Sequence, residues 1–332
     1  MSKNIVVVLK ADKDIGTGHL MRVKGIIRHF SQDNLYLVSD SLAKELYPLC
    51  SEYKKIVVTE KENLASECLK FKPDLVLEDH YFLDENFEKD IYPFTKVAII
   101  DDLCEVKHQC HLLFGQALSR NAESYKGKVP VDCRLCVGKS VNYIKECFSQ
   151  IKKVPCNEKN RVLVNFGGAD PVHGCLMCAK AIVESKLYLE YHFTFISGMS
   201  NPDHDKLKEL LSPVKEITLY HHCENITDIF ANTDLAIGAC GGMFNERVIA
   251  SIPAINAEIA DNQAGVGNLV RGAKIGLVFK VSELSDAAKL KAGLDELRTH
   301  FDEYANNCKN VYDPNGLLNV VTAIKELLDQ CN

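Results

Sequence analysis

Residues 10–22 read KADKDIGTGHLMR, and this stretch sets the architecture of the first half of the chain. The apolar run before it, residues 5–9, is typical of a buried parallel strand. Gly16 and Gly18 permit a tight turn, and His19 follows where the turn opens into an amphipathic helix. A strand, a glycine turn and a helix start in this order direct backbone N–H groups toward the carboxyl edge of a parallel sheet. We therefore expect His19 to face substrate and interpret it as the catalytic base.

The rest of the first half repeats the alternation of short apolar runs and amphipathic stretches. Strand-length runs separated by helical patterns predict a doubly wound parallel sheet, in which helices join consecutive strands. The predicted strands are residues 5–9, 36–38, 55–58, 75–77, 97–100 and 112–114, and the predicted helices are residues 20–30, 42–49, 63–71 and 84–91.

A polar, charged segment that contains Pro155 interrupts the alternation, which then starts again. We expect an N-terminal domain over residues 1–145, a linker over 146–160 and a C-terminal domain over 161–332, whose last helix can cross back. The chain is thus predicted to form two Rossmann-like halves that bind ligands in a cleft between them. The predicted strands of the second half are residues 161–166, 191–196, 216–220, 235–237 and 254–256, and the closing helix is 317–329.

The composition is that of a soluble globular protein, with 46% hydrophobic and 25% charged residues in a chain of 332. The net charge of −6 argues against nucleic acid as a partner, because phosphate backbones select basic surfaces. We expect neither a signal peptide nor a membrane partner, since no apolar run approaches about 20 residues. The expected protein is cytoplasmic and monomeric.

Fourteen cysteines do not predict a disulfide framework in a chain of this size without an export signal. Two CxxC pairs, Cys133 with Cys136 and Cys175 with Cys178, lie further apart than the ligand pairs of a zinc ribbon. We interpret them as reduced thiols that pack as small apolar side chains, with a zinc site as the less favoured alternative. No metal and no cofactor are expected.

Polar side chains follow two further strands of the first sheet. Asp79, His80 and Tyr81 come directly after one strand, at the same sheet edge as the glycine turn, where they could orient a sugar or share protons. Asp101 and Asp102 follow the next strand, and one of these carboxylates could hold the catalytic histidine in the useful tautomer. Capping of the following segment is the alternative for both clusters, and for Asp102 we prefer it.

Glycine pairs follow two strands of the second half. Backbone N–H groups at residues 167–168 can approach phosphate oxygens because no side chain covers them. Gly241, Gly242 and Met243 repeat this pattern before a helix, and Glu246 one turn inside could accept two hydrogen bonds from ribose hydroxyls. A plain turn is the alternative for either pair, but the repetition with an acid behind it favours a nucleotide.

The motifs IGTGHLMR, EDHY, IIDD, SRNAESYKGKVP, VNFGGADP and CGGMFNE with IPAINAEIADNQ occur in one order along residues 3–280. In this order they resemble the UDP-2,4-diacetamido-2,4,6-trideoxy-β-L-altropyranose hydrolases of bacterial pseudaminic acid synthesis. The resemblance implies a GT-B-like build, similar to the peptidoglycan N-acetylglucosaminyltransferase that uses UDP-GlcNAc. The chain departs from the family at Lys10, where Arg is usual, and in its second glycine loop, where hydroxyl residues are frequent.

The resemblance assigns roles to residues of the first half. His19 matches the family's catalytic histidine, the base that activates water, and we expect Gly18 beside it to contact substrate. Tyr81, and more loosely Asp79 and His80, match the DHY on the sugar side of the family's site. The implied partner is a UDP-linked diacetamido sugar.

The resemblance also implies nucleotide contacts in the second half. Gly167 and Gly168 match the first glycine pair of the nucleotide domain, and Glu246 matches the acid that binds uridine ribose in GT-B relatives. His222 and Cys223 lie where those relatives contact uracil.

Asn262 and Gln263 follow a further predicted strand. Their amides are neutral donors and acceptors suited to sugar hydroxyl or acetamido groups, and a capped helix is the alternative. Asn262 also matches the asparagine of the family's NQ pair.

The favoured hypothesis is hydrolysis. Neutral His19 takes a proton from a water that attacks the anomeric carbon with inversion, which releases UDP and a free 2,4-diacetamido-2,4,6-trideoxyhexose. Glycine N–H groups and helix N-termini meet the charge of the diphosphate. One alternative is a GT-B glycosyltransferase with a UDP-N-acetylhexosamine-type donor, in which an acceptor hydroxyl replaces water. The other is a nucleotide-sugar binding module, which would not need His19.

Overall fold

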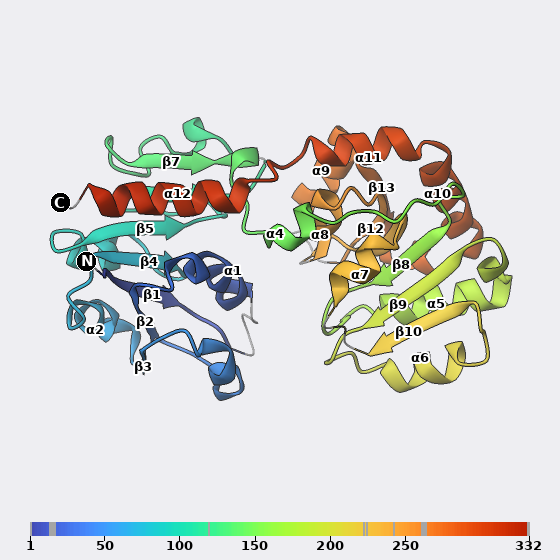
Figure 1. Ribbon diagram of the computed structural model, residues 1–332, viewed down its shortest axis with the longest axis horizontal. Helices are drawn as coiled ribbons and strands as arrows, with labels where there is room; N and C mark the ends of the chain where they lie inside the picture. The colour runs from blue at the N-terminus through green and yellow to red at the C-terminus, as the bar shows by residue number, and fades with distance from the viewer. Residues whose placement is uncertain are drawn as a thin grey trace. The chain divides into compact units, whose positions relative to one another are not determined.

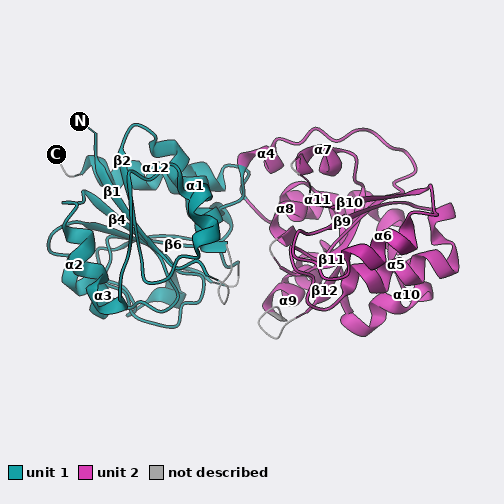
Figure 2. Cartoon of the chain, turned by 90° about the horizontal axis from the view of Figure 1, so that it is seen from below, with its two compact units in different colours: residues 1–145, 313–332 teal, residues 146–312 magenta. Residues whose placement is uncertain are grey.

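The computed structural model describes residues 2–12, 18–118, 120–221, 223, 225–241, 243–259 and 264–330. The chain forms two compact units, which Figure 2 draws in separate colours. Unit 1 comprises residues 1–145 and 313–332, and unit 2 comprises residues 146–312. Each unit has its own sheet and its own hydrophobic core.

The sheet of unit 1 has seven described strands, all paired in parallel, in the order β3-β2-β1-β4-β5-β6-β7. The apolar runs of the central strands are buried on both faces, as a parallel sheet covered by helices requires, while the edge strands β3 and β7 are only partly buried. The strands are β1 (Asn4–Leu9), β2 (Asn34–Ser39), β3 (Lys55–Val58), β4 (Leu75–Asp79), β5 (Lys96–Ile100), β6 (Leu112–Gly115) and β7 (Arg134–Val137).

The strand order of unit 1 reverses between β1 and β4, which are neighbours in the sheet. Their register pairs Leu9 with Asp79, so that both strands end at the same level. In open α/β sheets, ligands bind outside the carboxyl ends of the strands at such a switch point. The switch point of unit 1 therefore lies where β1 leads toward His19 and β4 ends at Asp79.

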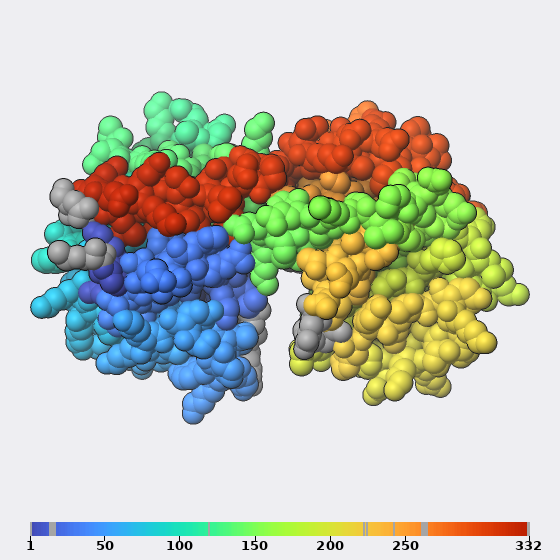
Figure 3. All heavy atoms as spheres, viewed as in Figure 1, coloured from blue at the N-terminus to red at the C-terminus, as the bar shows by residue number. Residues whose placement is uncertain are grey.

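Helices cover both faces of the first sheet. Successive side chains of a strand point to opposite faces, so Val7 packs with α1 (Gly18–Ile27) and α12 (Gly316–Asp329). Val8 packs instead with α2 (Leu64–Leu69) and α3 (Glu85–Ile91). Figure 3 shows α12, in red at the end of the chain, lying against the blue N-terminal residues of the same unit.

The sheet of unit 2 has six described strands, all parallel, in the order β10-β9-β8-β11-β12-β13 (Figure 1). Its switch point lies between β8 and β11, the two strands that the glycine pairs follow. The strands are β8 (Arg161–Asn165), β9 (His192–Ser197), β10 (Ile217–His221), β11 (Leu235–Ala239), β12 (Ala254–Glu258) and β13 (Gly276–Lys280). The helices are α4 (Glu146–Ser149), α5 (Gly174–Ser185), α6 (His204–Leu211), α7 (Ile226–Ala231), α8 (Met243–Ile249), α9 (Ala264–Ala273), α10 (Ala287–Thr299) and α11 (Phe301–Lys309).

The structure confirms the predicted α/β class and both parallel sheets. The predicted helix over residues 42–49 is wrong, because the chain forms a 3₁₀ segment, Lys44–Cys50, that contains Pro48. Proline lacks the N–H that an α-helix interior needs. In the part of the chain that the structure describes, no helix combines the length and the apolar character needed to cross a bilayer.

Segment 146–160, the expected linker, is part of unit 2. Lys153 Nζ donates to the carbonyl oxygens of Phe230 and Thr233 at 2.9 Å each, and the Val154 N–H donates to that of Ala231. Burial lowers the pKa of Lys153 to about 7. The last helix, α12, belongs to unit 1.

Candidate functional site

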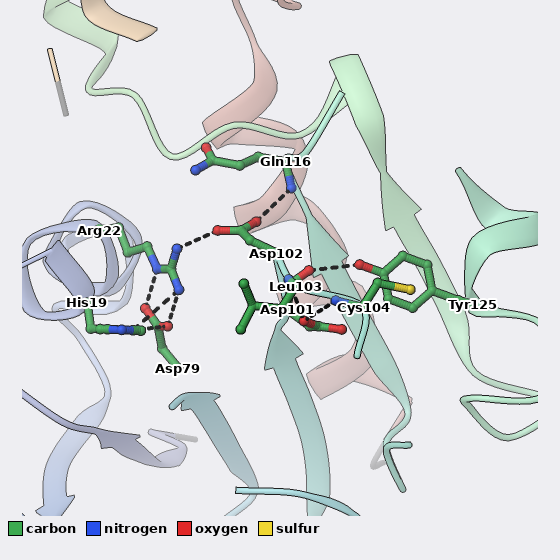
Figure 4. Close-up of polar contacts among 9 residues, drawn as sticks. All are labelled: His19, Arg22, Asp79, Asp101, Asp102, Leu103, Cys104, Gln116 and Tyr125. Carbon is green, nitrogen blue, oxygen red and sulfur yellow. Dashed lines mark hydrogen bonds and ion pairs between the residues drawn. The ribbon is translucent and has the colours of Figure 1, made fainter. Parts of the chain in front are cut away.

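His19 and Asp79 form a buried pair at the switch point of unit 1. His19 is the second residue of α1, and Asp79 is the last residue of β4. The His19 Nδ1 and Asp79 Oδ1 atoms are 2.5 Å apart, and the side chains are 5% and 0% exposed (Figure 4). Helix periodicity and strand register thus bring together two residues that are 60 positions apart in the sequence.

Arg22, one helical turn after His19, completes the surroundings of the carboxylate. Its Nε donates to Asp79 Oδ2 at 2.5 Å, and its Nη2 donates to Asp79 Oδ1, the oxygen that His19 contacts. Burial alone would raise the pKa of Asp79, but Arg22 and then His19 outweigh it, so that pKa lies below its ordinary value. Asp79 is therefore ionised at neutral pH and can only accept hydrogen bonds.

The charge of Asp79 determines which imidazole nitrogen carries a proton. An ionised carboxylate needs a donor at 2.5 Å, so we assign the proton of neutral His19 to Nδ1. The other ring nitrogen, Nε2, then carries the lone pair. This is the arrangement in which a histidine oriented by a carboxylate acts as a general base.

The sequence suggested that Asp101 or Asp102 would hold the histidine, and this expectation is wrong because Asp79 takes that place. Asp101 instead caps the following turn, where its Oδ1 accepts from the N–H groups of Leu103 and Cys104 at 2.8 and 2.9 Å. Asp102, for which capping was preferred, accepts from Arg22 Nη1 at 2.6 Å (Figure 4). Asp101 thus has the capping role, and Asp102 contacts the arginine beside His19 rather than His19 itself.

The three residues of the DHY stretch have different surroundings. Tyr81 is 42% exposed, and its ring meets the His19 ring edge-on with 4.3 Å between centroids. His80 is buried, accepts from the Phe82 N–H through Nδ1 at 3.2 Å, and places Nε2 3.0 Å from Asp40 Oδ1. Burial lowers the pKa of His80. Tyr81 is thus the member of this stretch that combines exposure with contact to His19.

The first glycine pair of unit 2 has fewer unused donors than the sequence suggested. Gly167 adopts a φ of 90°, but its N–H donates to Asn165 Oδ1 at 3.0 Å. At the start of α5, Asp170 accepts from the N–H groups of Gly174 and Cys175 at 2.7 and 2.8 Å. The protein's own carboxylate therefore occupies the anion position at this helix N-terminus.

Space remains around the same loop. A Cβ atom added at Gly167 or Gly168 would meet nothing within 4 Å, so a ligand can approach this backbone closely. Gly198 packs under the loop, where an added Cβ would lie 2.3 Å from the Gly168 carbonyl oxygen. Ser200 donates its N–H to that same oxygen at 3.1 Å. The loop is therefore supported from beneath and open on its other side.

A buried cation that the sequence analysis did not identify lies between the ends of β11 and β12. Arg247 of α8 is 2% exposed, and its Nη2 donates to the Ala239 carbonyl oxygen at 2.7 Å and to Asn256 Oδ1 at 3.0 Å. Burial lowers its pKa to about 10. Arg247 is the fifth residue of the short helix α8, and nothing in the sequence marks it as buried.

The remaining predicted residues are only partly described. In unit 1, Gly18 is exposed at the start of α1. In unit 2, Gly241, Met243, Glu246 and Cys223 are partly exposed, and Glu246 lies in the first turn of α8. The predictions for His222, Gly242, Asn262 and Gln263 fall outside the described residues.

No metal-binding cluster was found among the described residues: no group of three or more His, Cys, Asp or Glu side chains is arranged to hold an ion. Of the CxxC residues, Cys175 and Cys178 are buried in the core of unit 2. The Sγ atom of Cys133 lies 3.5 Å from the Sγ atom of Cys110, which is buried.

Comparisons with known proteins identify the fold. No protein-family model matches the chain. An uncharacterized protein of Methanocaldococcus jannaschii is 20% identical over 267 residues, which are 76% of this chain and 54% of that protein. The chain thus spans about half the length of the curated relative that it matches.

Solved structures match over nearly the whole chain. MurG of Acinetobacter baumannii gives a TM-score of 0.71 at 13% identity, covering 98% of this chain and 99% of its own. The calicheamicin glycosyltransferase CalG4 gives 0.66 at 11% identity, covering 99% and 98%. UDP-GlcNAc 2-epimerase from Neisseria meningitidis, bound to UDP-GlcNAc, gives 0.61 at 14% identity, covering 98% and 100%. At these identities the likeness shows the fold, which is GT-B-like.

Proposed function

We propose that this chain is a UDP-sugar enzyme that breaks the bond between the anomeric carbon and UDP, with His19 as general base. The observation that carries the proposal is the 2.5 Å contact between His19 Nδ1 and Asp79 Oδ1 at the switch point of the first sheet. Asp79 is fully enclosed, so it acts through His19. A histidine and a carboxylate in this relation are the parts needed to activate an O–H nucleophile.

Proton transfer follows from the assigned tautomer. Nε2 takes a proton from the attacking hydroxyl group, which leaves His19 as an imidazolium beside ionised Asp79. The carboxylate stabilises this new charge without taking the proton itself. General-base assistance of this kind is worth roughly 10²–10⁴-fold in rate.

We assign sugar contact in unit 1 to Tyr81, because its partly exposed ring lies edge-on to His19. Gly18, where an added Cβ would meet nothing within 4 Å, leaves room for substrate beside it. His80 is hydrogen-bonded to Asp40 and to the N–H of Phe82. Because His80 and Phe82 flank Tyr81 in the sequence, these bonds help to fix the backbone at Tyr81. These are roles in positioning, while the base itself remains His19.

We assign UDP binding to unit 2. Gly168 and the second glycine loop supply backbone N–H groups for the diphosphate, since the N–H of Gly167 is already used by Asn165. Glu246 accepts hydrogen bonds from the ribose. The uracil contacts of His222 and Cys223 and the sugar contacts of Asn262 and Gln263 complete this proposal, as does Gly242 beside Gly241 and Met243 in the second loop.

The attacking group is either a sugar hydroxyl or water. The solved structures with this fold include glycosyltransferases, and this supports transfer to a hydroxyl acceptor more than hydrolysis. Hydrolysis of a UDP-linked diacetamido sugar for pseudaminic acid synthesis is supported by the resemblance of the sequence motifs. Both reactions use the same base and the same leaving group, and they differ in what Nε2 of His19 deprotonates.

An NMR experiment separates these reactions. The protein is incubated with UDP-GlcNAc or a UDP-diacetamido sugar, with and without an added hydroxyl acceptor, and His19→Gln is the matched control. UDP release without acceptor, with inversion in the first product, supports hydrolysis, and release only with acceptor supports transfer. Binding without turnover, or isomerisation with UDP retained, contradicts the proposed bond cleavage.

A further inference from the structure

His19 is bordered by two opposite charges rather than by a carboxylate alone. Arg22 Nη2 lies 3.3 Å from His19 Nδ1, and both groups bind Asp79 Oδ1. If the imidazole gains a proton, the new charge therefore faces an anion that favours it and a guanidinium that opposes it. The carboxylate is also shared, because Arg22 takes both of its oxygens. Asp79 by itself would favour the imidazolium more strongly than it does with Arg22 in place.

A second carboxylate offsets Arg22 from its far side. Asp102 Oδ2 accepts from Arg22 Nη1 at 2.6 Å, while Asp102 Oδ1 accepts from the Gln116 N–H at 3.1 Å. The side chains of Arg22 and Asp102 are 13% and 16% exposed, so these charges are weakly screened by water. Burial opposes the charge of Arg22, but Asp79 and Asp102 outweigh it and hold its pKa well above the ordinary value.

We propose that Arg22 and Asp102 are positioning residues with opposite effects, which together set the pH range over which His19 is neutral. Arg22 fixes Asp79 in the plane that orients Nδ1–H and works against protonation of the imidazole. Asp102 limits this effect by neutralising part of the arginine's charge. The inference deepens the proposed function, because a general base must be neutral before it can take a proton.

The variants tested below leave the other titratable groups around His19 unchanged. The Tyr81 and Tyr143 rings lie on the guanidinium, with centroids 5.9 and 5.6 Å from Arg22 Cζ. Burial raises the pKa of both tyrosines, so they are neutral near pH 7. His80 is held by Asp40, which also faces the ammonium group of Lys10 at 3.9 Å. Tyr53 and Glu78 also interact electrostatically with Asp79, and burial raises the pKa of both.

The test is an NMR titration that does not depend on catalysis. The His19 ring signals of the full chain are identified by their loss in His19→Gln, and the titration is then followed in Arg22→Met, Arg22→Lys and Asp102→Asn. Long-range ¹H–¹⁵N spectra report which ring nitrogen carries the proton. Arg134→Met is the matched control, because Arg134 belongs to unit 1 and pairs with Glu326 on the surface.

Opposite shifts are the expected result. Loss of the guanidinium in Arg22→Met moves the midpoint of the His19 titration to higher pH, and loss of the anion in Asp102→Asn moves it to lower pH. Arg22→Lys keeps the charge, so its midpoint should lie close to that of the wild type. Arg134→Met should leave the midpoint unchanged.

Several results would overturn the inference. Shifts in the same direction, or a neutral imidazole with its proton on Nε2, would contradict it, as would equal midpoints in all variants. If Arg22→Met does not fold, Asp102→Asn and Arg22→Lys still decide the sign. Where the wild type releases UDP, the acid limb of kcat/KM should follow the titration midpoint with little change in KM. Opposite shifts without any UDP release would reject the proposed function and leave the charge relationship intact.

Discussion

Arg22 Nη2 lies 3.3 Å from Nδ1 of His19, three positions before it in the same helix. Residues at this spacing share a helix face, so α1 presents both groups toward the end of β4. The carboxylate of Asp79 lies between them and binds both. A buried anion with this pairing is costly to disturb, because removing one partner leaves the other charge uncompensated.

Replacement of His19 tests its assignment as the base. His19→Gln keeps a polar side chain of similar length but offers no basic nitrogen, so turnover should fall by about 10²–10⁴-fold. The Kd for UDP, measured by calorimetry, should stay within about twofold, because binding is assigned to unit 2. His192→Gln on the surface is the matched control and should behave as wild type. Turnover at the wild-type rate in His19→Gln would show that the base is elsewhere.

Replacement of Asp79 should affect both catalysis and stability. In Asp79→Asn the amide can donate to Nδ1 and so favour the wrong tautomer, and a loss of up to about 10⁴-fold in kcat is expected. Arg22 also loses its buried partner, which should lower the free energy of unfolding by about 3 kcal/mol.

Denaturant unfolding and steady-state kinetics measure the two effects of Asp79→Asn separately. Asp132→Asn, an exposed change in the same unit, is the control and should alter neither. Full activity in Asp79→Asn would mean that the carboxylate does not orient the base.

Glu246 offers a test of the nucleotide assignment in unit 2. Glu246→Gln keeps the shape of the side chain but weakens its hydrogen bonds to ribose hydroxyls, so the Kd for UDP should rise about tenfold. Glu184→Gln, an exposed change on α5, is the control. Unchanged UDP affinity in Glu246→Gln, with both proteins folded, would remove Glu246 from the binding site.

The architecture could be predicted because its signals are local. Apolar runs, glycine turns and amphipathic stretches give the strands and helices directly, and the parallel order follows from their alternation. The 3₁₀ segment at Lys44–Cys50 was missed because an apolar periodicity outweighed Pro48 in the interpretation. The sequence patterns predicted neither the strand β13 nor the helices α10 and α11.

The partners within the candidate site could be predicted only in part. The position of His19 after a strand and a glycine turn marked it, and Arg22 follows three positions later in the same amphipathic stretch. The choice between Asp79, Asp101 and Asp102 depends on strand register and on side-chain direction at the sheet edge. These are tertiary properties, and no pattern within a single segment encodes them.

Close packing at the end of β11 predicts a sensitive glycine. A Cβ atom at Gly238 would lie 2.4 Å from the Asn165 carbonyl oxygen and 2.7 Å from Arg247 Nη1. Since the first of these is a backbone atom of a paired strand, Gly238→Ala should lower the free energy of unfolding by about 1–3 kcal/mol. Chemical denaturation measures the change. Gly272→Ala in α9 has nothing within 4 Å and should be neutral or slightly stabilising, and equal effects of the two changes would contradict this account.

A buried histidine on the other face of the first sheet predicts how stability varies with pH. His108 Nδ1 lies 2.6 Å from Glu88 Oε1, and its Nε2 lies 3.5 Å from Asp101 Oδ2. Burial alone would lower the pKa of His108, but these two carboxylates outweigh it and raise that pKa to about 10. The folded chain therefore keeps this proton up to a higher pH than the unfolded chain, in which the histidine pKa is about 6.5.

The contribution of His108 to stability should accordingly be complete below about pH 6.5 and disappear as the pH rises through about 10. His108→Gln removes this titration, so the difference in unfolding free energy between wild type and variant should shrink steadily between these limits. Denaturant unfolding at intervals of pH measures that difference, in which the other titrating groups cancel. His192→Gln should run parallel to wild type over the whole range. A constant difference between wild type and His108→Gln from pH 6 to 10 would show that His108 is not held protonated by Glu88 and Asp101.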